Sequence, residues 1–285
     1  MMATRSTRLY HLSRLTGTAI RYTLVACFLL FALLPFFWML STALKPATQI
    51  YTSPVTWWPS SPTLENFVAV ITRADFTVIM GNTLLVAGVS ATVSTTVALL
   101  AAYGLSRLAS RWGELLVLLL LFAQMIPTIL FVIPYFLVFR TLGLLDTLLV
   151  LIVTHVSLTM PIATWLLRRF IAKVPRELDE AALIDGCGQV GALFRVVAPS
   201  ARAGIGAVFF YAFLGSWHEY LFALSLTSSP ENRVVTLGIT SLVGQYQVSW
   251  GELMALGILT TLPLIALFLL VERNLVEGLA GGVKG

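Results

Sequence analysis

The segment ELDEAALIDGCGQVGALFRVVAPSAR, Glu177–Arg202, lies between two long apolar stretches and differs from both. It holds four carboxylates and two arginines, although only 11% of the 285 residues in the chain are charged. Pro175, just before it, suits the start of a helix, and acidic side chains are favoured in the first turn. Asp185 and Gly186 then predict the end of that helix, because glycine readily adopts the conformation that closes one.

A second short helix is predicted from about Gln189 to Ala198, and Pro199 should end it. Apolar side chains recur at helical spacing in both helices. They are Leu178, Ala181 and Ala182 in the first helix and Val190, Leu193, Phe194 and Val197 in the second. Small alanines on such a face would let another protein approach closely. A structured inter-helix loop without a partner fits the spacing equally well.

The composition is typical of a membrane protein. Hydrophobic residues make up 58% of the chain, and the charged fraction is well below the roughly 25% of a soluble domain. A helix needs about 20 apolar residues to cross the bilayer core. Six segments reach about that length and predict an all-α membrane protein with six transmembrane helices: Tyr22–Leu44, Asn82–Ser106, Leu115–Phe139, Thr147–Leu167, Ala203–Leu226 and Leu253–Val271.

These spans define the expected organisation: an N-terminal tail (residues 1–21), a six-span domain (22–272) with the charged loop at about 168–202, and a C-terminal tail (273–285). The first apolar run exceeds the roughly 7–15 residues of a signal-peptide core, so we expect an uncleaved span. The second span is rich in Ala, Gly, Ser and Thr, which allow close packing in lipid. Prolines within spans indicate kinked helices in a bundle, namely Pro127, Pro134, Pro161 and Pro263.

Loop charges predict the orientation. With the N-terminus inside, the inner segments hold fourteen Lys and Arg residues and the outer segments four: Lys45, Arg73, Arg140 and Arg233. Because cytoplasmic loops carry the excess of positive charge, both termini and the Glu177–Arg202 segment should be cytoplasmic. We therefore expect a multi-pass protein of a cell membrane.

The sequence argues against several other classes of protein. The charges form no basic stripe, so nucleic-acid binding is not expected. Two cysteines and three histidines show no metal-ligand spacing, and no phosphate-binding glycine loop or nucleophile elbow occurs. An intramembrane enzyme would need a catalytic constellation across spans, and none is apparent. We expect a non-catalytic chain without a cofactor or metal of its own.

Polar residues within the apolar spans are the remaining candidates for function, because their burial in a membrane is costly. Trp217, His218, Glu219 and Tyr220 are adjacent in the fifth span. They form either an interfacial cluster, with the carboxylate reaching water, or a polar patch on a solute path. Gln124 and His155 more simply predict hydrogen bonds between helices. Two outer-loop tryptophans, Trp57 and Trp58, are either interfacial anchors or contacts for an external partner.

Several motifs together resemble a known family. Glu180-Ala181-Ala182, three residues, Gly186, nine residues and then Val196-Val197-Ala198-Pro199 resembles the EAA loop of type I ABC importer permeases, with valine and alanine replacing the usual isoleucine and leucine. TLENF, NTLLVA, AAYGLSRL and IPYFLVFRTLGLLDT resemble the carbohydrate-uptake branch. The tail EGLAGGVKG is similar to the C-terminus of the maltose-type second permease subunit. His218 stands where that branch has asparagine.

The resemblance implies a permease subunit of an ATP-driven, binding-protein-dependent importer of a sugar or sugar-like solute. Its implied partners are a homologous second permease, a cytoplasmic ATPase dimer that binds ATP and Mg²⁺, and an extracytoplasmic solute-binding protein. The ATPase would hold the EAA loop and a tail segment through Glu180, Ala181, Ala182, Asp185, Gly186, Val196 and Pro199, and through Gly281, Gly282 and Lys284. The alternative is a stand-alone secondary transporter or channel that uses Glu219 and His218.

Overall fold

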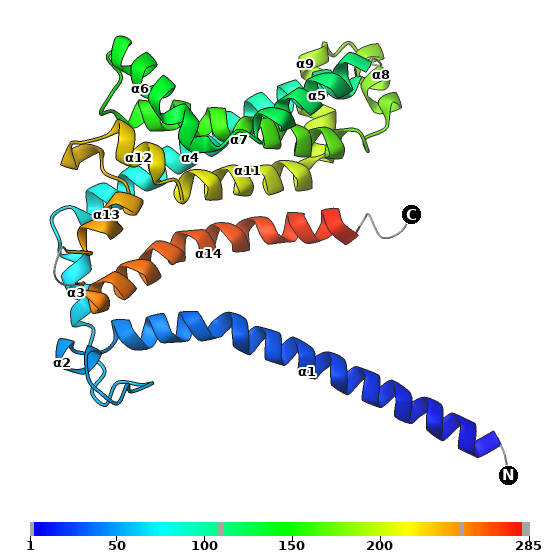
Figure 1. Ribbon diagram of the computed structural model, residues 1–285. Coiled ribbons are helices and arrows are strands. Elements are labelled where there is room, and N and C mark those ends of the chain that lie inside the picture. The colour runs from blue at the N-terminus through cyan, green and yellow to red at the C-terminus, as the bar shows by residue number, and fades with distance from the viewer. Residues whose placement is uncertain (1–2, 108–110, 245–247, 281–285) are drawn as a thin grey trace. The chain divides into compact units, whose positions relative to one another are not determined.

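The structure is a computed structural model that describes residues 3–107, 111–244 and 248–280. Its regular elements are helices, and no β-strand occurs in those ranges (Figure 1). The chain divides into two compact units. Unit 1 comprises Met1–Val70 and Gln247–Ile258, and unit 2 comprises Ile71–Tyr246 and Leu259–Gly285.

Four helices hold most of the apolar sequence: α1 (Ala3–Ala43), α4 (Phe76–Arg107), α7 (Leu148–Ile171) and α14 (Trp250–Ala280). Each contains a stretch long and apolar enough to cross a membrane. These stretches confirm the first, second, fourth and sixth predicted spans, and they are Gly17–Ala43, Phe76–Arg107, Leu148–Ile171 and Trp250–Glu272. Pro161 and Pro263 lie inside their helices without ending them.

The third predicted span, Leu115–Phe139, is not one straight helix. α5 (Arg111–Ala123) is separated by four residues from η1 (Thr128–Phe131) and α6 (Val132–Thr141), and the two parts meet at 90°. Pro127 lies in the break, where its lack of an N–H interrupts the helical hydrogen bonds. The described residues therefore give four spans, or up to six if each bent pair of helices crosses once.

The fifth predicted span, Ala203–Leu226, is also divided. α11 (Arg202–Trp217) and α12 (Leu221–Leu226) flank a break at residues 218–220. At its other end α11 follows the helical run Gln189–Ser200 with a bend of 87°. A 16-residue helix is only about 24 Å long, so α11 by itself falls short of the roughly 30 Å bilayer core.

Small side chains let α4 pack closely against α7 and α11 in the middle of unit 2, where Figure 1 also shows these three helices side by side. The buried residues of α4 recur every three or four positions, which places them on one face. They are Ile79, Thr83, Val86, Ala87, Ser90, Ala91, Ser94, Thr95, Ala98, Leu99 and Ala102. Large residues such as Leu85, Val89 and Leu100 are exposed on α4, as expected for contact with lipid. The predicted close packing of this span is confirmed.

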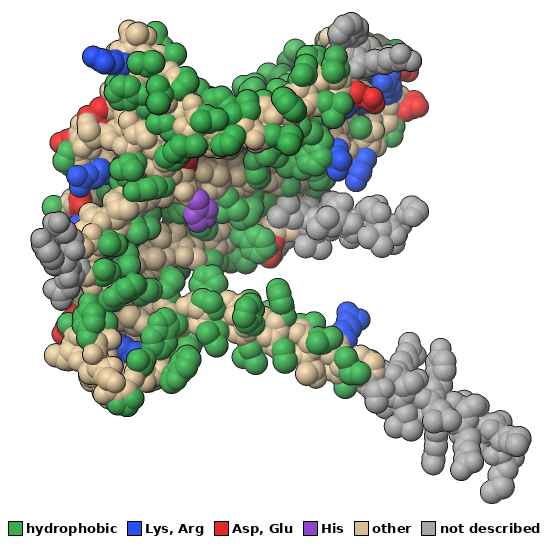
Figure 2. Space-filling view, viewed as in Figure 1, with side chains coloured by type: hydrophobic (Ala, Val, Ile, Leu, Met, Phe, Trp, Pro, Cys, Tyr) green, Lys and Arg blue, Asp and Glu red, His purple; other side chains and the backbone are tan. Residues whose placement is uncertain are grey.

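Charged side chains of unit 2 lie mainly toward the ends of its helices, and apolar side chains cover most of the visible face between them (Figure 2). One end of unit 2, called the α8 end below, contains the last turn of α4 and the helices α8 (Arg176–Ile184), α9 (Gln189–Ala192) and α10 (Ala198–Ser200). The other, the α12 end, contains α6, α12, η3 (Pro230–Asn232) and α13 (Val235–Ser241).

Asp146 connects two loops at the α12 end. This residue has a positive φ of 58°, and its carboxylate accepts hydrogen bonds from the backbone N–H groups of Ser228 (2.8 Å) and Ser229 (2.9 Å) and from the Ser229 hydroxyl. Asn232 also donates to its carbonyl oxygen at 2.7 Å. The backbone hydrogen bond from Ser228 and those from Ser229 hold the pKa of Asp146 well below its usual range.

Unit 1 is held together by hydrogen bonds around the C-terminal end of α1. Asn66, in α3 (Glu65–Ile71), donates to the carbonyl oxygens of Ala43 (2.9 Å) and Lys45 (2.8 Å). The loop after α2 (Ala47–Ile50) returns to α1, where the Ser41 hydroxyl donates to the Trp57 carbonyl oxygen at 2.6 Å. These bonds satisfy backbone groups that would otherwise be left without partners at the helix end.

Candidate functional site

The helix α8 forms as its sequence predicts. Pro175 is the N-cap, and Glu177 and Asp179 lie in the first turn, where carboxylates favour the helix dipole. At the other end the Gly186 N–H donates to Leu183 O at 3.1 Å and the Cys187 N–H to Ala182 O at 3.0 Å. This is the Schellman pattern, and the positive φ of 87° at Gly186 provides it.

The second helical run of the loop is longer than predicted. α9 passes into a π-helical turn, η2 (Leu193–Val197), and then into α10, which ends at Ser200. Pro199 is therefore inside the run, and the prediction that it ends the helix was wrong. Proline has no N–H to donate and its ring crowds the preceding turn of a helix. The π turn just before Pro199 is wider than an α-helical turn, so it leaves room for the ring.

The inner side of this loop is packed into unit 2. Leu193 and Val197 are at most 1% exposed and share a buried cluster with residues of α4 and α7 such as Leu99 and Leu167. Ala192 is fully buried and Ala182 is 6% exposed. Ala182 thus packs inside the chain, so the expected apolar stripe of Leu178, Ala181 and Ala182 is divided between two sides of α8.

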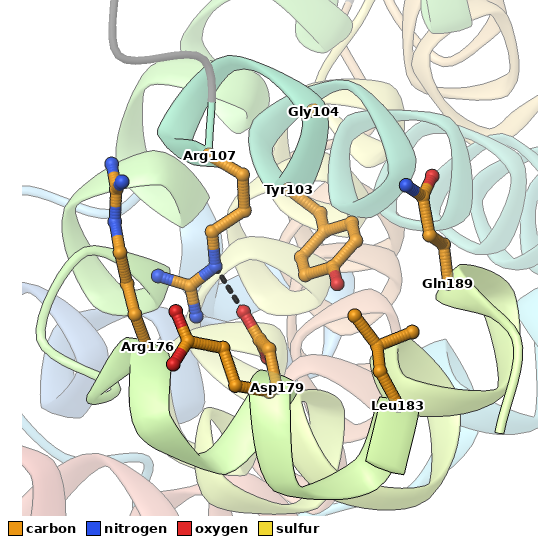
Figure 3. A pocket seen from close by; sticks show the side chains of 8 residues that line it. Tyr103, Gly104, Arg107, Arg176, Asp179, Leu183 and Gln189 are labelled. Carbon is orange, nitrogen blue, oxygen red and sulfur yellow. Dashed lines mark ion pairs between the residues drawn. The ribbon is translucent and has the colours of Figure 1, made fainter. Parts of the chain in front are cut away.

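An ion pair joins α8 to the last turn of α4 (Figure 3). The guanidinium of Arg107 contacts the carboxylate of Asp179, and both terminal nitrogens of Arg107 lie 3.4 Å from the Val174 carbonyl oxygen. Asp179 is 6% exposed. Arg176 reaches back to the Ser106 carbonyl oxygen at 3.4 Å. These contacts border a pocket of about 480 Å³, which Tyr103, Gly104, Glu180, Leu183 and Gln189 complete.

The outer side of the loop carries exposed apolar side chains, called the loop patch below. Its members are Leu178 (42% exposed), Leu183 (44%), Ile184 (86%), Val190 (65%) and Phe194 (47%). Glu180, Ala181, Asp185, Gly186 and Pro199 are exposed as well, and Val196 is half-buried. Val190 and Phe194 were expected on one side with Leu193 and Val197, but only the latter two are buried. An exposed apolar patch among charges is typical of a surface that binds another protein.

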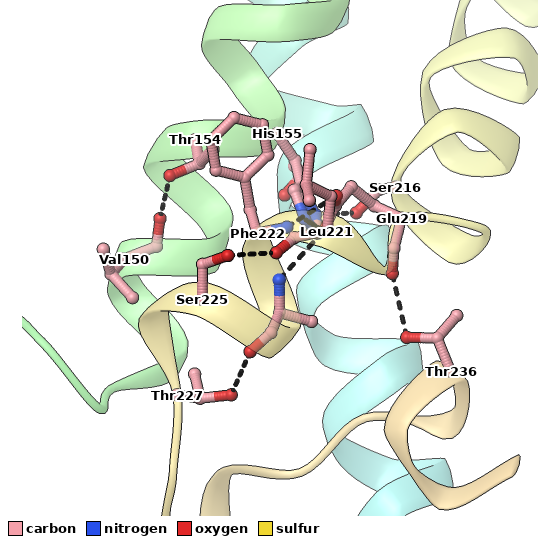
Figure 4. Close-up of polar contacts among 12 residues, drawn as sticks. Val150, Thr154, His155, Ser216, Glu219, Leu221, Phe222, Ser225, Thr227 and Thr236 are labelled. Carbon is pink, nitrogen blue, oxygen red and sulfur yellow. Dashed lines mark hydrogen bonds and ion pairs between the residues drawn. The ribbon is translucent and has the colours of Figure 1, made fainter. Parts of the chain in front are cut away.

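Within the polar cluster of the fifth span, Glu219 is occupied by contacts within the chain (Figure 4). Glu219 caps α12: its carboxylate accepts from the backbone N–H groups of Phe222 (2.8 Å) and Ala223 (3.1 Å). His155 of α7 lies 3.3 Å from the same carboxylate through Nε2 and 2.6 Å from the Ser216 hydroxyl through Nδ1. Glu219 therefore stabilises the broken helix and ties it to α7.

The neighbours of Glu219 differ in exposure. Trp217 is 3% exposed and stacks on Phe213, with ring centroids 5.4 Å apart. His218 and Tyr220 are exposed. The expected helix–helix hydrogen bonds are confirmed for His155 and for Gln124, which donates to the Leu158 carbonyl oxygen at 3.1 Å. No cluster of metal-ligating side chains occurs among the described residues.

The sequence that contains the α8 loop matches a known family. A sequence profile described as the binding-protein-dependent transport system inner membrane component matches residues 94–280. The chain belongs to this family. The matched region includes the whole loop and both divided spans, so this permease is a membrane subunit of an ABC transport system.

Curated relatives cover nearly the whole permease. It is 32% identical over 271 residues to the sulfoquinovosyl glycerol transport system permease protein of Agrobacterium fabrum, covering 95% of each chain. It is 36% identical to an inner membrane ABC transporter permease protein of Escherichia coli, covering 93% of this chain and 95% of the relative. The trehalose/maltose transport system permease protein of Thermococcus litoralis is 30% identical, and the match covers 89% of this chain and 92% of the relative.

A solved structure has the same fold. One chain of a bacterial ABC transporter involved in the import of the acidic polysaccharide alginate superimposes on the permease with a TM-score of 0.76. The match covers 91% of the permease and 96% of that chain at 19% sequence identity. The expected ABC importer permease fold, with its location in the plasma membrane, is confirmed. The tail residues Gly281, Gly282 and Lys284 lie outside the described residues.

Proposed function

We propose that the permease is one membrane subunit of an ATP-driven importer of a sugar or sugar-like solute. Relatives named for sulfoquinovosyl glycerol, trehalose/maltose and diacetylchitobiose support this solute class. In this proposal a homologous second permease completes the translocation path, and an extracytoplasmic binding protein delivers the solute. ATP and Mg²⁺ bind to a separate ATPase dimer, and the permease has no catalytic role. Both termini are cytoplasmic.

The observation that carries the proposed coupling is the two-sided construction of the loop. Its inner side is fixed to α4 and α7, whereas the side chains of the loop patch on its outer side are 42–86% exposed. We assign the outer side to contact with the ATPase, with Glu180, Ala181 and Asp185 beside the patch. Gly186 shapes the turn between the two halves, and Val196 and Pro199 complete the second half. The tail residues Gly281, Gly282 and Lys284 would add a further contact.

The alternative of a stand-alone secondary transporter would need an ion or proton relay of its own. Glu219, together with His218, was the candidate for that relay. Its carboxylate already accepts two backbone N–H groups and contacts His155, so few of its acceptor sites remain for a solute or ion. We find no observation that favours this alternative.

Ile184→Glu tests the docking surface directly. Ile184 is 86% exposed, so a carboxylate there should be tolerated by the fold while making burial against another protein costly. Tagged permease would be purified from the membranes of its own host, and ATP hydrolysis by the eluted complex would be measured. We expect ATPase activity to co-purify with the wild type. Most of this activity should be absent from the complex purified with Ile184→Glu. Leu64→Glu, at a 63% exposed leucine of unit 1, is the matched control.

Equal ATPase recovery with Ile184→Glu and with the wild type would contradict the proposed docking surface. The solute class has a separate test, in which the gene is deleted in its host and growth on single sugars is measured. Loss of growth on one sugar, restored by the wild-type gene, is the expected result. Unchanged growth and uptake for every sugar transported by the host would contradict the proposed solute class.

A further inference from the structure

A small aromatic pocket lies within unit 1, at the C-terminal end of α1. It has a volume of about 270 Å³, and three aromatic side chains, Trp38, Tyr51 and Trp250, form much of its wall. Thr42 and Lys45 are the polar residues of its lining. A pocket with mostly apolar walls and a few polar groups is the usual form of a small-molecule site, and this volume suits a single ring-sized ligand.

The aromatic side chains of the pocket are held in place by other parts of unit 1. Trp57 contacts Trp38 edge to face, with ring centroids 5.5 Å apart and an interplanar angle of 76°. The Tyr51 hydroxyl donates to the Val248 carbonyl oxygen at 2.5 Å. Fixed aromatic faces bind a ligand at little cost in side-chain entropy, and they suit ligands with one apolar face and a polar rim.

Lys45 brings a positive charge into the pocket wall. Only 2% of this residue is exposed, and its ammonium donates to the Thr56 carbonyl oxygen at 2.5 Å and lies 4.5 Å from the Trp38 ring centroid. No carboxylate pairs with it among the described residues. Burial lowers the pKa of Lys45. A buried cation without an anion is unfavourable, so a ligand that supplies a negative charge would be stabilised here.

Thr42 provides a second, independent sign of a missing ligand. It is 6% exposed, and its hydroxyl is one of the few buried side-chain groups that have no hydrogen-bond partner among the described residues. Buried hydroxyls normally find a partner. A ligand hydroxyl or carboxylate seated beside Lys45 would satisfy it.

We propose that this pocket binds one saccharide ring that carries a negatively charged group, such as a carboxylate. The C–H face of the ring packs against the tryptophans, the anionic group meets the ammonium of Lys45, and the ring hydroxyls hydrogen-bond at the rim. The inference takes only the sugar nature of the ligand from the proposed function. It adds that the permease itself contacts the solute, at a site separate from the α8 loop.

Binding is measured on the purified full-length permease in a detergent without a sugar headgroup. The ligands are D-glucuronate, D-galacturonate and D-mannuronate, with D-glucose as the neutral counterpart, and saturation-transfer NMR gives the affinities. We expect at least one uronate to bind at least tenfold more tightly than glucose. Lys45→Met should abolish this preference, and Trp250→Leu should weaken uronate binding at least tenfold. Lys173→Met, at an exposed lysine of the α7–α8 connection, should change neither the affinity for the uronate nor the preference over glucose.

Several outcomes would overturn the inference: no uronate binds, glucose binds equally well, or Lys45→Met leaves the preference intact. Displacement of the uronate by glycerol phosphate would instead indicate a site for lipid headgroups and would also overturn it. If Lys45→Met loses its helical circular dichroism, the partly exposed Trp250 still provides the test through Trp250→Leu. Because these measurements need neither an ATPase nor uptake, their failure is distinct from failure of the proposed function.

Discussion

Asp179→Asn tests whether the ion pair between α4 and α8 holds the loop in place. Asparagine has nearly the shape of aspartate but no charge, so Arg107 would keep its surroundings and lose its counter-charge. In the structure only 9% of the Asp179 side chain and 18% of the Arg107 side chain are exposed. Little water is therefore available to replace the missing carboxylate charge.

The size of the effect follows from this partial burial. Removing one partner of a buried ion pair costs about 3–5 kcal/mol, whereas an exposed pair contributes about 0–1 kcal/mol. Arg107 borders the 480 Å³ pocket and keeps its long contacts with the Val174 carbonyl oxygen, which reduces the loss. We expect Asp179→Asn to lower the free energy of unfolding by about 2–3 kcal/mol.

A double-mutant cycle measures the pair itself. The wild type, Asp179→Asn, Arg107→Gln and the double variant would be unfolded with sodium dodecyl sulfate in mixed micelles, and their free energies of unfolding compared. We expect a coupling energy of about 1–3 kcal/mol. The double variant should be less destabilised than the sum of the single variants, because it leaves no unpaired charge enclosed.

A second ion pair of unit 2 provides the control. Arg73 and Asp75 lie 3.1 Å apart, but their side chains are 35% and 32% exposed. Asp75→Asn should therefore cost less than about 1 kcal/mol. If Asp179→Asn costs no more than this control, or if its coupling energy with Arg107 is below about 0.5 kcal/mol, the pair does not attach α8 to α4 and the reasoning is refuted.

Three further variants test other contacts by thermal unfolding of the purified permease. Glu219→Gln should lower the free energy of unfolding by about 1–2 kcal/mol, because the carboxylate of Glu219 caps α12 in the wild type. Unchanged stability would argue against that role. The pKa of Asp146 is depressed in the folded protein, so the stability that its carboxylate contributes is fully present above about pH 4 and is lost as the pH falls through the depressed pKa. The free energy of unfolding of the wild type should therefore exceed that of Asp146→Asn by more at pH 7 than at pH 3. Gly204→Ala would place a Cβ against the ring of Phe170 and should lower the free energy of unfolding by about 1–3 kcal/mol. Gly88→Ala should be harmless, because no atom of the described residues lies within 4 Å of the new Cβ.

Gly186→Ala separates backbone strain from side-chain contact in the loop. A Cβ at Gly186 would meet no atom of the described residues within 4 Å, but the φ of 87° there is unfavourable for alanine by about 1–2 kcal/mol. Gly188 is a matched control, since its Cβ position is equally open and its φ is −74°. Only Gly186→Ala should reduce the ATPase activity that purifies with the permease. Equal effects of the two variants would contradict a role for the turn.

The four continuous spans could be predicted because hydropathy, length and small-residue spacing are local properties of the sequence. The turn at Gly186 was predictable for the same reason: acidic residues, a helix-forming stretch and a glycine follow one another within a dozen positions. The break at residues 124–127 was not predictable from composition, since an apolar run looks the same whether it is straight or bent. Pro127 marked the place but not the angle of 90°, which depends on what the two halves pack against.

The role of Glu219 shows a different limit. In sequence it is a carboxylate inside an apolar run, which suggests either escape to water or a solute path. The structure gives it backbone partners three and four residues ahead, because the helix breaks at residues 218–220 and a new one begins. A carboxylate just before the first turn of a helix is a recognisable capping signal. The signal can be used only if a helix is already expected to begin at that place.

The division of the loop into two sides has a mechanical consequence. Leu193 and Val197 are buried among residues of α4 and α7, and Asp179 is paired with α4, so a displacement of α8 cannot be absorbed within the loop alone. Close-packed interiors transmit strain because they contain little empty space. A protein that binds the loop patch and shifts it would therefore move the ends of α4 and α7 together. The small residues of α4 let it pack closely against α7, so a displacement of one helix is expected to displace the other.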